Sequence, residues 1–401
     1  MKTRVAVFFG GRSPEHDVSI VTGLQAFKAI APDRFSVFPV YVTTGGAWLV
    51  GEPLADQKIY IPQGAVLNEL ASVTLDLSPN IDGVGRLLFK DKRSFFGAAK
   101  PLEFDAALLA FHGTFGEDGR VQALLELANV PYTGLRSFPS ALSMDKVVTK
   151  RALAGTAIQT LPSVVVRRQQ SGFLPSIAEL EALLANVTYP LIVKPVHLGS
   201  SIGVAKATSL EEVRAALPPI FKLDNEALLE PFVPNLVEYN VAVRRTGDQI
   251  KTSAIEQPKV AQELLDFKSK YWPSAGGKTG GKVPGTVSQG MLSLTREINP
   301  KLAPEFEAKI RDWAAACFAT LGASGAPRID FLCNRATGEL WLNEVNPCPG
   351  SFGFFLWEAA ADPILFTDLL TALLDEALEL HKAAQMPADP TQPDARLFKH
   401  T

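Results

Sequence analysis

The 401-residue chain is long enough for two or three domains, each with its own hydrophobic core. A hydrophobic fraction of 47% and a charged fraction of 20% are typical of a globular protein, which excludes fibrous and largely disordered classes. A net charge of -3 and a pI near 6.0 give no electrostatic reason to expect nucleic acid or an anionic membrane as a partner. We therefore expect small-molecule substrates.

The N-terminal segment MKTRVAVFFGG enters a strand pattern without the apolar region of a signal peptide, and no apolar run has the length of a membrane span. These features predict a cytoplasmic protein. The three cysteines, Cys317, Cys333 and Cys348, are odd in number and lack CxxC spacing. This pattern argues against a disulfide framework and against a zinc site.

Residues 1–134 are predicted to form a first α/β domain. Strand and helix patterns alternate, and twice a strand is followed by a glycine-bearing loop and a helix, the arrangement in which small ligands bind at strand ends. The predicted elements are strands at 5–9, 35–42 and 105–111 and helices at 18–30 and 120–129. Residues 44–104 hold short apolar runs broken by Gly, Pro and Asn, whose order the sequence does not assign.

Two further units are predicted, at 135–233 and 234–385, followed by a disordered tail at 386–401. The first of them has helices at 141–154 and 177–185, strands at 163–167, 191–194 and 227–233, and a helix opened by a capping box at Ser209 and Glu212. The second contains an alanine-rich helix at 312–321, a long glycine-rich loop at 267–295 and a closing helix. We find no internal repeat.

The third unit contains two neighbouring strand-like runs, 326–332 and 340–346, that carry Arg328, Asp330, Glu344 and Asn346. Residues two apart on a strand share a face, so pairing of the strands would bring all four side chains into one patch. Hard oxygen donors beside a fixed cation suit Mg²⁺ with a nucleotide polyphosphate. The alternative is a surface salt-bridge cluster on a hairpin.

A second motif runs from Lys194 to Gly203, where a strand delivers a lysine into a loop of Gly and Ser that suits phosphate oxygens. The spacing differs from a P-loop, and an ordinary hairpin is the alternative. Lys146 is a second candidate cation or a solvated helix lysine. Glu230 could accept a hydrogen bond from adenine or ribose, or could be an exposed carboxylate on an edge strand.

Seven ordered motifs together resemble the D-alanine–D-alanine ligase family of the ATP-grasp superfamily. They are 9–19 (FGGRSPEHDVS), 112–119 (HGTFGEDG), 131–134 (PYTG), 143–146 (SMDK), 194–203, 328–330 (RID) and 344–350 (EVNPCPG). The resemblance spans residues 4 to about 350. It implies an α/β ATP-grasp fold: a Rossmann-like, parallel-sheet substrate domain at 1–134, a central subdomain with the phosphate-covering loop at 135–233, and a subdomain with the lid and the Mg²⁺ site at 234–385.

The resemblance also implies an ATP-driven reaction in which a D-amino acid is activated as an acyl phosphate and then attacked by the amine of a second one. Asp330, Glu344 and Asn346 would hold two Mg²⁺ ions, with Mn²⁺ as an alternative ion. Arg328 would stabilise the acyl phosphate and the tetrahedral oxyanion. The implied nucleotide contacts are Lys146, Lys194, Ser200, Ser201, Glu230, Phe232, Val233 and Glu238.

For the amino acid substrates, the resemblance implies that Glu15 orients the ammonium of the first one and links to the lid through Ser200 and Tyr271. Lys270 and Tyr271 resemble the lid of the dipeptide-forming members, which favours an amine acceptor over D-lactate. His112 would lie near the first substrate, although backbone hydrogen bonding is an equal alternative for a loop histidine. Gly350 and Ser351 would meet the second substrate. Relatives also suggest a homodimer.

Three departures from the family pattern bear on the second substrate and the nucleotide. Phe355 stands where a serine that receives the second carboxylate is expected, with Ser351 as its alternative. The turn before Glu238 is one residue longer than usual, and the lid at 275–282 is unusually rich in glycine. The open alternatives are thus D-alanine or another amino or hydroxy acid as acceptor, or a nucleotide-binding regulator without ligase activity.

Overall fold

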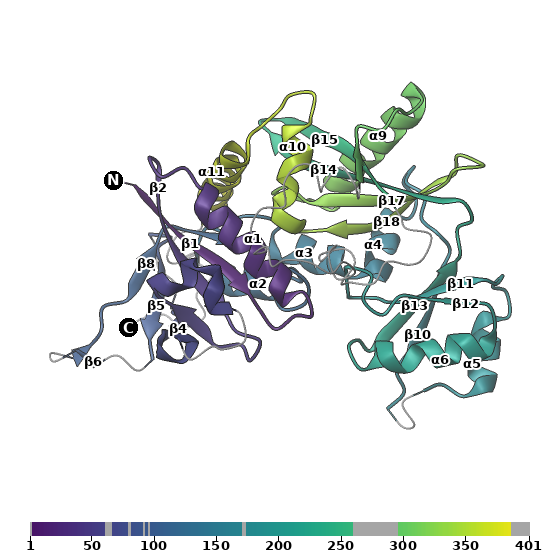
Figure 1. Ribbon diagram of the computed structural model, residues 1–401, viewed down its shortest axis with the longest axis horizontal. Coiled ribbons are helices and arrows are strands. Elements are labelled where there is room, and N and C mark those ends of the chain that lie inside the picture. The colour runs from purple at the N-terminus through teal and green to yellow at the C-terminus, as the bar shows by residue number, and fades with distance from the viewer. Residues whose placement is uncertain are drawn as a thin grey trace, which may run out of the picture.

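The computed structural model describes residues 2–60, 66–78, 82–90, 93–94, 97–170, 174–259 and 296–385. Along this part of the chain, three large sheets follow one another (Figure 1). The predicted lid with Lys270 and Tyr271, and the predicted tail from Met386, lie outside the described residues. No helix in the described ranges combines the length and the apolar character needed to cross a membrane.

The first sheet has seven strands, of which β1 pairs in parallel with β2 and β9, as the sequence predicts for a Rossmann-like domain. β1 is buried on both faces. Its odd-numbered residues pack with α1 and α11, and its even-numbered residues face α2. The strand order is β8 (Leu102–Phe104), β5 (Gly85–Phe89), β4 (Ala71–Leu75), β3 (Trp48–Val50), β2 (Phe35–Val42), β1 (Thr3–Gly10) and β9 (Ala106–Leu109); the helices are α1 (His16–Ala29), α2 (Arg120–Leu127) and α11 (Phe366–Ala384).

The segment that the sequence could not order extends this sheet. β3, β4, β5 and β8 pair antiparallel with their neighbours, so the sheet is mixed. These strands are three to five residues long, too short for a clear periodic signal. The same segment contains η1 (Glu52–Ala55), η2 (Gln57–Tyr60), η3 (Val66–Glu69) and the small pair β6 (Arg93–Ser94) and β7 (Gly97–Ala98).

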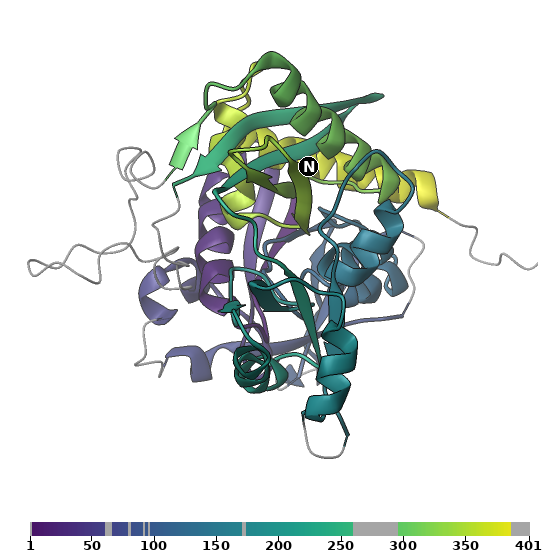
Figure 2. The same cartoon turned by 90° about the vertical axis from the view of Figure 1, so that its right-hand side faces the viewer.

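The second sheet has four strands and forms a lobe of its own with α5 and α6, at the lower right of Figure 1 and at the bottom of Figure 2. Its core joins both helices to the inner faces of the strands. The order is β10 (Val164–Arg167), β13 (Glu226–Pro231), β11 (Leu191–Pro195) and β12 (Ala205–Ala207), with α5 (Ile177–Leu184) and α6 (Leu210–Phe221). β11 and β12 are antiparallel neighbours, so the Gly-Ser motif is the loop of a hairpin.

The third sheet has five antiparallel strands, with α9 (Pro304–Thr320) packed on one face. Its order is β16 (Arg296–Ile298), β15 (Gln249–Pro258), β14 (Leu236–Thr246), β17 (Arg328–Asn334) and β18 (Leu340–Asn346). On β14 and β17 the apolar odd-numbered residues, such as Val241 and Phe331, face α9. The alternate residues therefore point to the opposite face.

Local corrections apply to the helices. The predicted helix at 141–154 is wrong, because Asp145 has extended dihedral angles and separates α3 (Ser137–Met144) from α4 (Lys146–Leu153). Its side chain instead accepts hydrogen bonds from the backbone N–H groups of Val147 and Val148 and so caps α4. At α6, Ser209 caps the helix as predicted, but the carboxylate of Glu212 accepts from Thr208 rather than completing a capping box.

The C-terminal helices return to the first sheet. Phe352, Leu356 and Trp357 from η4 (Gly350–Gly353) and α10 (Phe354–Glu358) share one core with α1 and α11. The third sheet is therefore connected to the first domain by a continuous apolar core. The division at residues 134 and 233 stays a prediction, and α11 packs with α1 in the core of the first domain.

Candidate active site

The strands β17 and β18 bring the four predicted side chains together. The register places Arg328 opposite Asn346 and Asp330 opposite Glu344. The guanidinium of Arg328 donates two hydrogen bonds to Asp330, at 2.7 and 2.6 Å, and the amide of Asn346 donates to the same carboxylate at 2.9 Å. Asp330 is 8% exposed. The predicted patch is therefore present and centred on a buried carboxylate, which disfavours the alternative of a surface salt-bridge cluster.

This face of the sheet continues over three more strands with polar residues that the sequence analysis missed. Asn240 lies opposite Asp330, and Glu256 lies opposite Asn240. The Asn240 amide is 3.3 Å from Glu256, and Glu256 is ion-paired with Arg296 on β16 at 2.8 Å. The sequence could not predict that these side chains lie beside Asp330, because their positions depend on the pairing of strands that are distant in sequence.

The donor set fits a divalent cation. Asp330, Glu344 and Asn346 offer hard oxygen atoms, the ligands that Mg²⁺ prefers. Burial raises the pKa of Asp330, and the nearby carboxylates of Glu344 and Glu256 raise it further, whereas Arg328 lowers it. A site in which several carboxylates crowd one another is stabilised by a bound cation.

The lysines reach the same region from other elements. Lys146, 7% exposed at the start of α4, is 3.2 Å from Glu344 and donates to the carbonyl oxygen of Leu198 at 2.7 Å. Lys194 at the end of β11 donates to Asn343 of β18 at 2.8 Å. Both lysines are buried, so neither is a solvated surface lysine. Their contacts with Glu344 and Asn343 of β18 connect the second sheet and α4 to the third sheet.

Glu230 lies between two lysines. It is 3% exposed, on the inner strand β13, and its carboxylate is ion-paired with Lys194 at 2.6 Å and with Lys150. Burial raises the pKa of Glu230, but Lys194 and Lys150 outweigh burial, so the pKa is lowered overall. The alternative of an exposed edge-strand carboxylate is wrong, because β10 and β11 flank β13 on both sides. In this structure Glu230 holds Lys194.

Two loops converge on Glu15, which precedes the first turn of α1. The Ser200 hydroxyl donates to the Glu15 carboxylate, as the resemblance implies. Ser200 and Ser201 have φ of 54° and 58°, so the loop turns sharply at these two residues. On the other side, a Cβ added at Gly113 would lie 2.6 Å from Glu15 Oε2. Glu15 thus lies where the loop of the second sheet meets the first domain.

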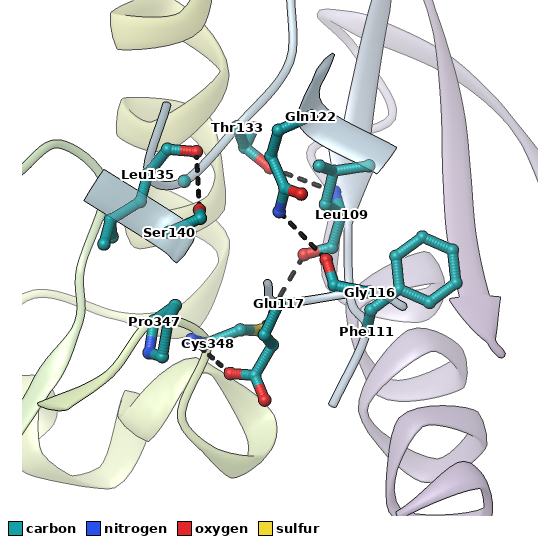
Figure 3. Close-up of a pocket in the computed structure, with 11 residues that line it drawn as sticks. Leu109, Phe111, Gly116, Glu117, Gln122, Thr133, Leu135, Ser140, Pro347 and Cys348 are labelled. Atoms are coloured by element: carbon teal, nitrogen blue, oxygen red, sulfur yellow. Dashed lines mark hydrogen bonds between the residues drawn. The ribbon is translucent and has the colours of Figure 1, made fainter. Parts of the chain in front are cut away.

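Glu117 is a buried carboxyl group that the sequence analysis did not single out. It accepts from the backbone N–H of Gly113 at 2.5 Å and of Cys348 at 2.8 Å, and so joins the loop after β9 to the loop after β18 (Figure 3). Burial and the nearby Glu15 carboxylate raise its pKa well above the ordinary value. Its position in the loop that follows a buried strand was the available signal. Burial also raises the pKa of the Cys348 thiol, which disfavours a nucleophilic role.

His112 is buried and hydrogen-bonds Thr22 of α1 at 2.8 Å. Burial lowers its pKa to about 4, so the imidazole is neutral at physiological pH. The backbone N–H of Ser351 donates to the same Thr22 hydroxyl at 3.1 Å, and the Ser351 side chain donates to Gln25 at 2.5 Å. His112 and Ser351 therefore share one network with α1, next to Gly350 at the start of η4.

The residues predicted to meet the adenosine lie at the end of β13 and the start of β14. Phe232 carries the ammonium of Lys206 over its ring at 4.0 Å, and Val233 is buried. Glu238 lies on β14 two residues before Asn240, hence on the face that carries Asp330. These positions agree with one binding region, and the individual nucleotide contacts stay predictions.

Comparisons with known proteins agree with this geometry. Residues 4–135 match the family model for the D-ala D-ala ligase N-terminus, and residues 153–375 match that for the D-ala D-ala ligase C-terminus. The chain belongs to the D-alanine–D-alanine ligase family. The D-alanine--D-alanine ligases of Chlorobium chlorochromatii and Deinococcus radiodurans are both 32% identical to it, and the alignments cover 94% of this chain and 98% and 99% of those proteins.

Solved structures give the same family. The D-alanine-D-alanine ligase of Helicobacter pylori has a TM-score of 0.69 at 28% identity, covering 94% of this chain and 99% of that one. The VanG D-Ala:D-Ser ligase of Enterococcus faecalis has a TM-score of 0.70 at 25% identity, covering 95% and 100%. The ATP-grasp fold predicted from the sequence is therefore confirmed. Lys270 and Tyr271 lie outside the described residues, and the roles of the other site residues stay predictions.

Proposed function

We propose that this protein joins two D-alanines into D-alanyl-D-alanine for peptidoglycan synthesis, with conversion of ATP to ADP and phosphate. The observation that carries the proposal is the meeting of three elements: the Arg328–Asp330 patch, the lysines held by Glu230 and Glu344, and Glu15 with the Gly-Ser loop. Together these contacts connect all three large sheets. Family membership supports the reaction, and the contacts support a site assembled for it.

In the first step, a carboxylate oxygen of one D-alanine attacks the γ-phosphorus of ATP. A new O–P bond forms, the bond to the bridging oxygen breaks, and ADP leaves. Lys146 and Lys194 would bind the phosphates, and the Ser200–Ser201 turn would cover them. Mg²⁺ held by Asp330, Glu344 and Asn346 would neutralise the charge of the transferring phosphoryl group.

In the second step, the amine of the other D-alanine attacks the acyl carbon and phosphate departs. Arg328 would stabilise the negative charge on the tetrahedral oxygen, since its guanidinium is already fixed by two hydrogen bonds to Asp330. Glu15, beside the positive end of α1, would hold the ammonium of the first D-alanine. His112, neutral and buried, would fill space and orient the loop rather than carry charge.

The experiment is phosphate release by the purified protein with Mg-ATP and D-alanine, with every product identified by mass. D-alanyl-D-alanine is the expected product. Adding a panel of D-amino and D-hydroxy acids tests the second candidate, a different acceptor. Phe355 in place of the expected serine is the observation that favours that candidate. ATP binding without turnover of any acceptor would overturn the ligase proposal and favour a regulator.

Two coarser points accompany the proposal. The family acts on small amino acids. On the basis of the resemblance we also propose that the protein is a homodimer, and analytical ultracentrifugation would test this oligomeric state. We also place the enzyme in the cytoplasm, as the sequence predicts, because its proposed substrate ATP is found there.

A further inference from the structure

A line of contacts runs across the third sheet from Arg328 to a second arginine at its edge. Asp330 on β17, Asn240 on β14 and Glu256 on β15 lie opposite one another in register. Arg296, on β16, is ion-paired with Glu256 at 2.8 Å. Because β16 pairs with β15 through Pro258 and Arg296, the Arg296 side chain starts on the face that carries Glu256.

We propose that Arg296, supported by Phe355, binds the free carboxylate of the second amino acid. The inference rests on the proposed function, because a ligase that joins two amino acids must hold one carboxylate that does not react. A guanidinium is the side chain best suited to this task, since it can donate two parallel hydrogen bonds to a carboxylate. Arg296 is then a residue that determines acceptor specificity.

Arg296 has unused donors. Its Nη1 contacts Glu256, while its buried Nε has no hydrogen-bond partner in the described part of the chain. The side chain is 24% exposed, so a small ligand can reach it. The other cations of the site are also held by carboxylates: Arg328 by Asp330 with two hydrogen bonds, Lys146 by Glu344, and Lys150 and Lys194 by Glu230.

Phe355 gives the guanidinium its position. The Arg296 guanidinium carbon lies 4.6 Å from the centroid of the Phe355 ring, a cation–π contact that restricts a long side chain. This contact explains how a phenylalanine can stand where a carboxylate-binding serine is expected: the ring supports a cation instead of donating a hydrogen bond. Ser351 is a weaker substitute, because its hydroxyl already donates to Gln25.

The chain offers a matched control. Arg244 on β14 also lies over an aromatic ring of α10, with its guanidinium carbon 5.7 Å from the Trp357 centroid. Both arginines connect the third sheet to α10, but only Arg296 is ion-paired with the site-face residue Glu256. If the two arginines served only to hold α10 against the third sheet, Arg244→Met and Arg296→Met would therefore have the same effect on the ratio of the two acceptors.

In the experiment D-alanine is the donor in every turnover and competes as acceptor with D-alaninamide, which lacks the carboxylate; the ratio of the two products, separated by mass, gives the ratio of kcat/KM for the two acceptors. For Arg296→Met, kcat/KM with D-alanine as acceptor should fall about 10- to 100-fold, the range of a lost hydrogen bond to a charged group, and with D-alaninamide about 2-fold or less. Arg296→Lys should recover part of the difference, and Arg244→Met should leave the ratio of the two acceptors unchanged.

Phe355→Leu, which keeps the guanidinium and removes the ring, should shift the acceptor ratio in the same direction by a smaller factor. An equal loss for both acceptors in Arg296→Met, or no loss for either, would overturn the inference. Formation of D-alanyl-D-alanine by the wild-type protein is scored separately and tests the proposed function alone. The two failures are therefore distinguishable.

Discussion

Replacement of Glu230 by Gln should destabilise the protein strongly, because the amide cannot compensate two buried ammonium groups. Lys194 lies 2.6 Å from the carboxylate and Lys150 contacts it, and the side chains of the three are 9%, 10% and 4% exposed in the order Lys194, Lys150, Glu230. Removing one partner of a buried ion pair costs about 3 to 5 kcal/mol in the free energy of unfolding. We expect Glu230→Gln to fall in this range.

The control lies on the same strand. Glu226 pairs with Arg167, whose side chain is 76% exposed, at 2.7 Å. Glu226→Gln should therefore cost about 1 kcal/mol or less, as exposed pairs do. Urea unfolding followed by circular dichroism and by tryptophan fluorescence measures both variants. Similar destabilisation by Glu226→Gln and Glu230→Gln would refute the argument, and so would a Glu230→Gln protein as stable as the wild type.

Three further predictions follow, two on the site and one on His197, in the loop after β11. Arg328→Ala should lower kcat about 100-fold or more while calorimetry shows ADP binding within a few-fold of wild type, and a loss of nucleotide affinity at unchanged kcat would contradict the assigned role. Asp330→Asn should raise the Mg²⁺ concentration needed for half-maximal rate at least about 10-fold, because a carboxylate ligand of the metal is lost. An unchanged Mg²⁺ concentration at half-maximal rate would show that the ion binds at another position. Asp145 and Asp224 raise the pKa of His197 from its ordinary 6.5 to about 10. The protonated imidazole therefore makes its full contribution to the free energy of unfolding below pH 6.5, and this contribution is lost as the pH rises toward 10. His197→Gln should remove this part of the fall in unfolding free energy between pH 7 and 10, and an unaltered pH profile would show that the protonated imidazole contributes nothing.

The patch on β17 and β18 could be predicted because it follows from the two-residue period of a strand and from one short connection. Arg328 and Asp330 are two residues apart, and so are Glu344 and Asn346, which leaves only the pairing of two neighbouring strands to assume. The loop that brings Ser200 to Glu15 was accessible only through the family resemblance, because 185 residues separate them.

The missed residues share one physical reason. Asn240, Glu256 and Arg296 join the site through strand pairings whose register is set by tertiary packing and by the chain between them. Asn343 faces Lys194 beside a register shift between β17 and β18, and the sequence shows no sign of that irregularity. Asp145 did carry a signal, since aspartate favours helix caps, but the apolar periodicity on both sides of it suggested a continuous helix.

The most direct test of the proposed chemistry follows the oxygen that the donor carboxylate loses. With D-alanine labelled with ¹⁸O in both carboxylate oxygens and unlabelled Mg-ATP, the acyl-phosphate route transfers one labelled oxygen to each phosphate released with D-alanyl-D-alanine. Mass spectrometry of the phosphate should therefore show one ¹⁸O per molecule. Phosphate without label, formed together with the dipeptide, would contradict activation of the carboxylate by phosphorylation and with it the roles assigned to Arg328 and the lysines.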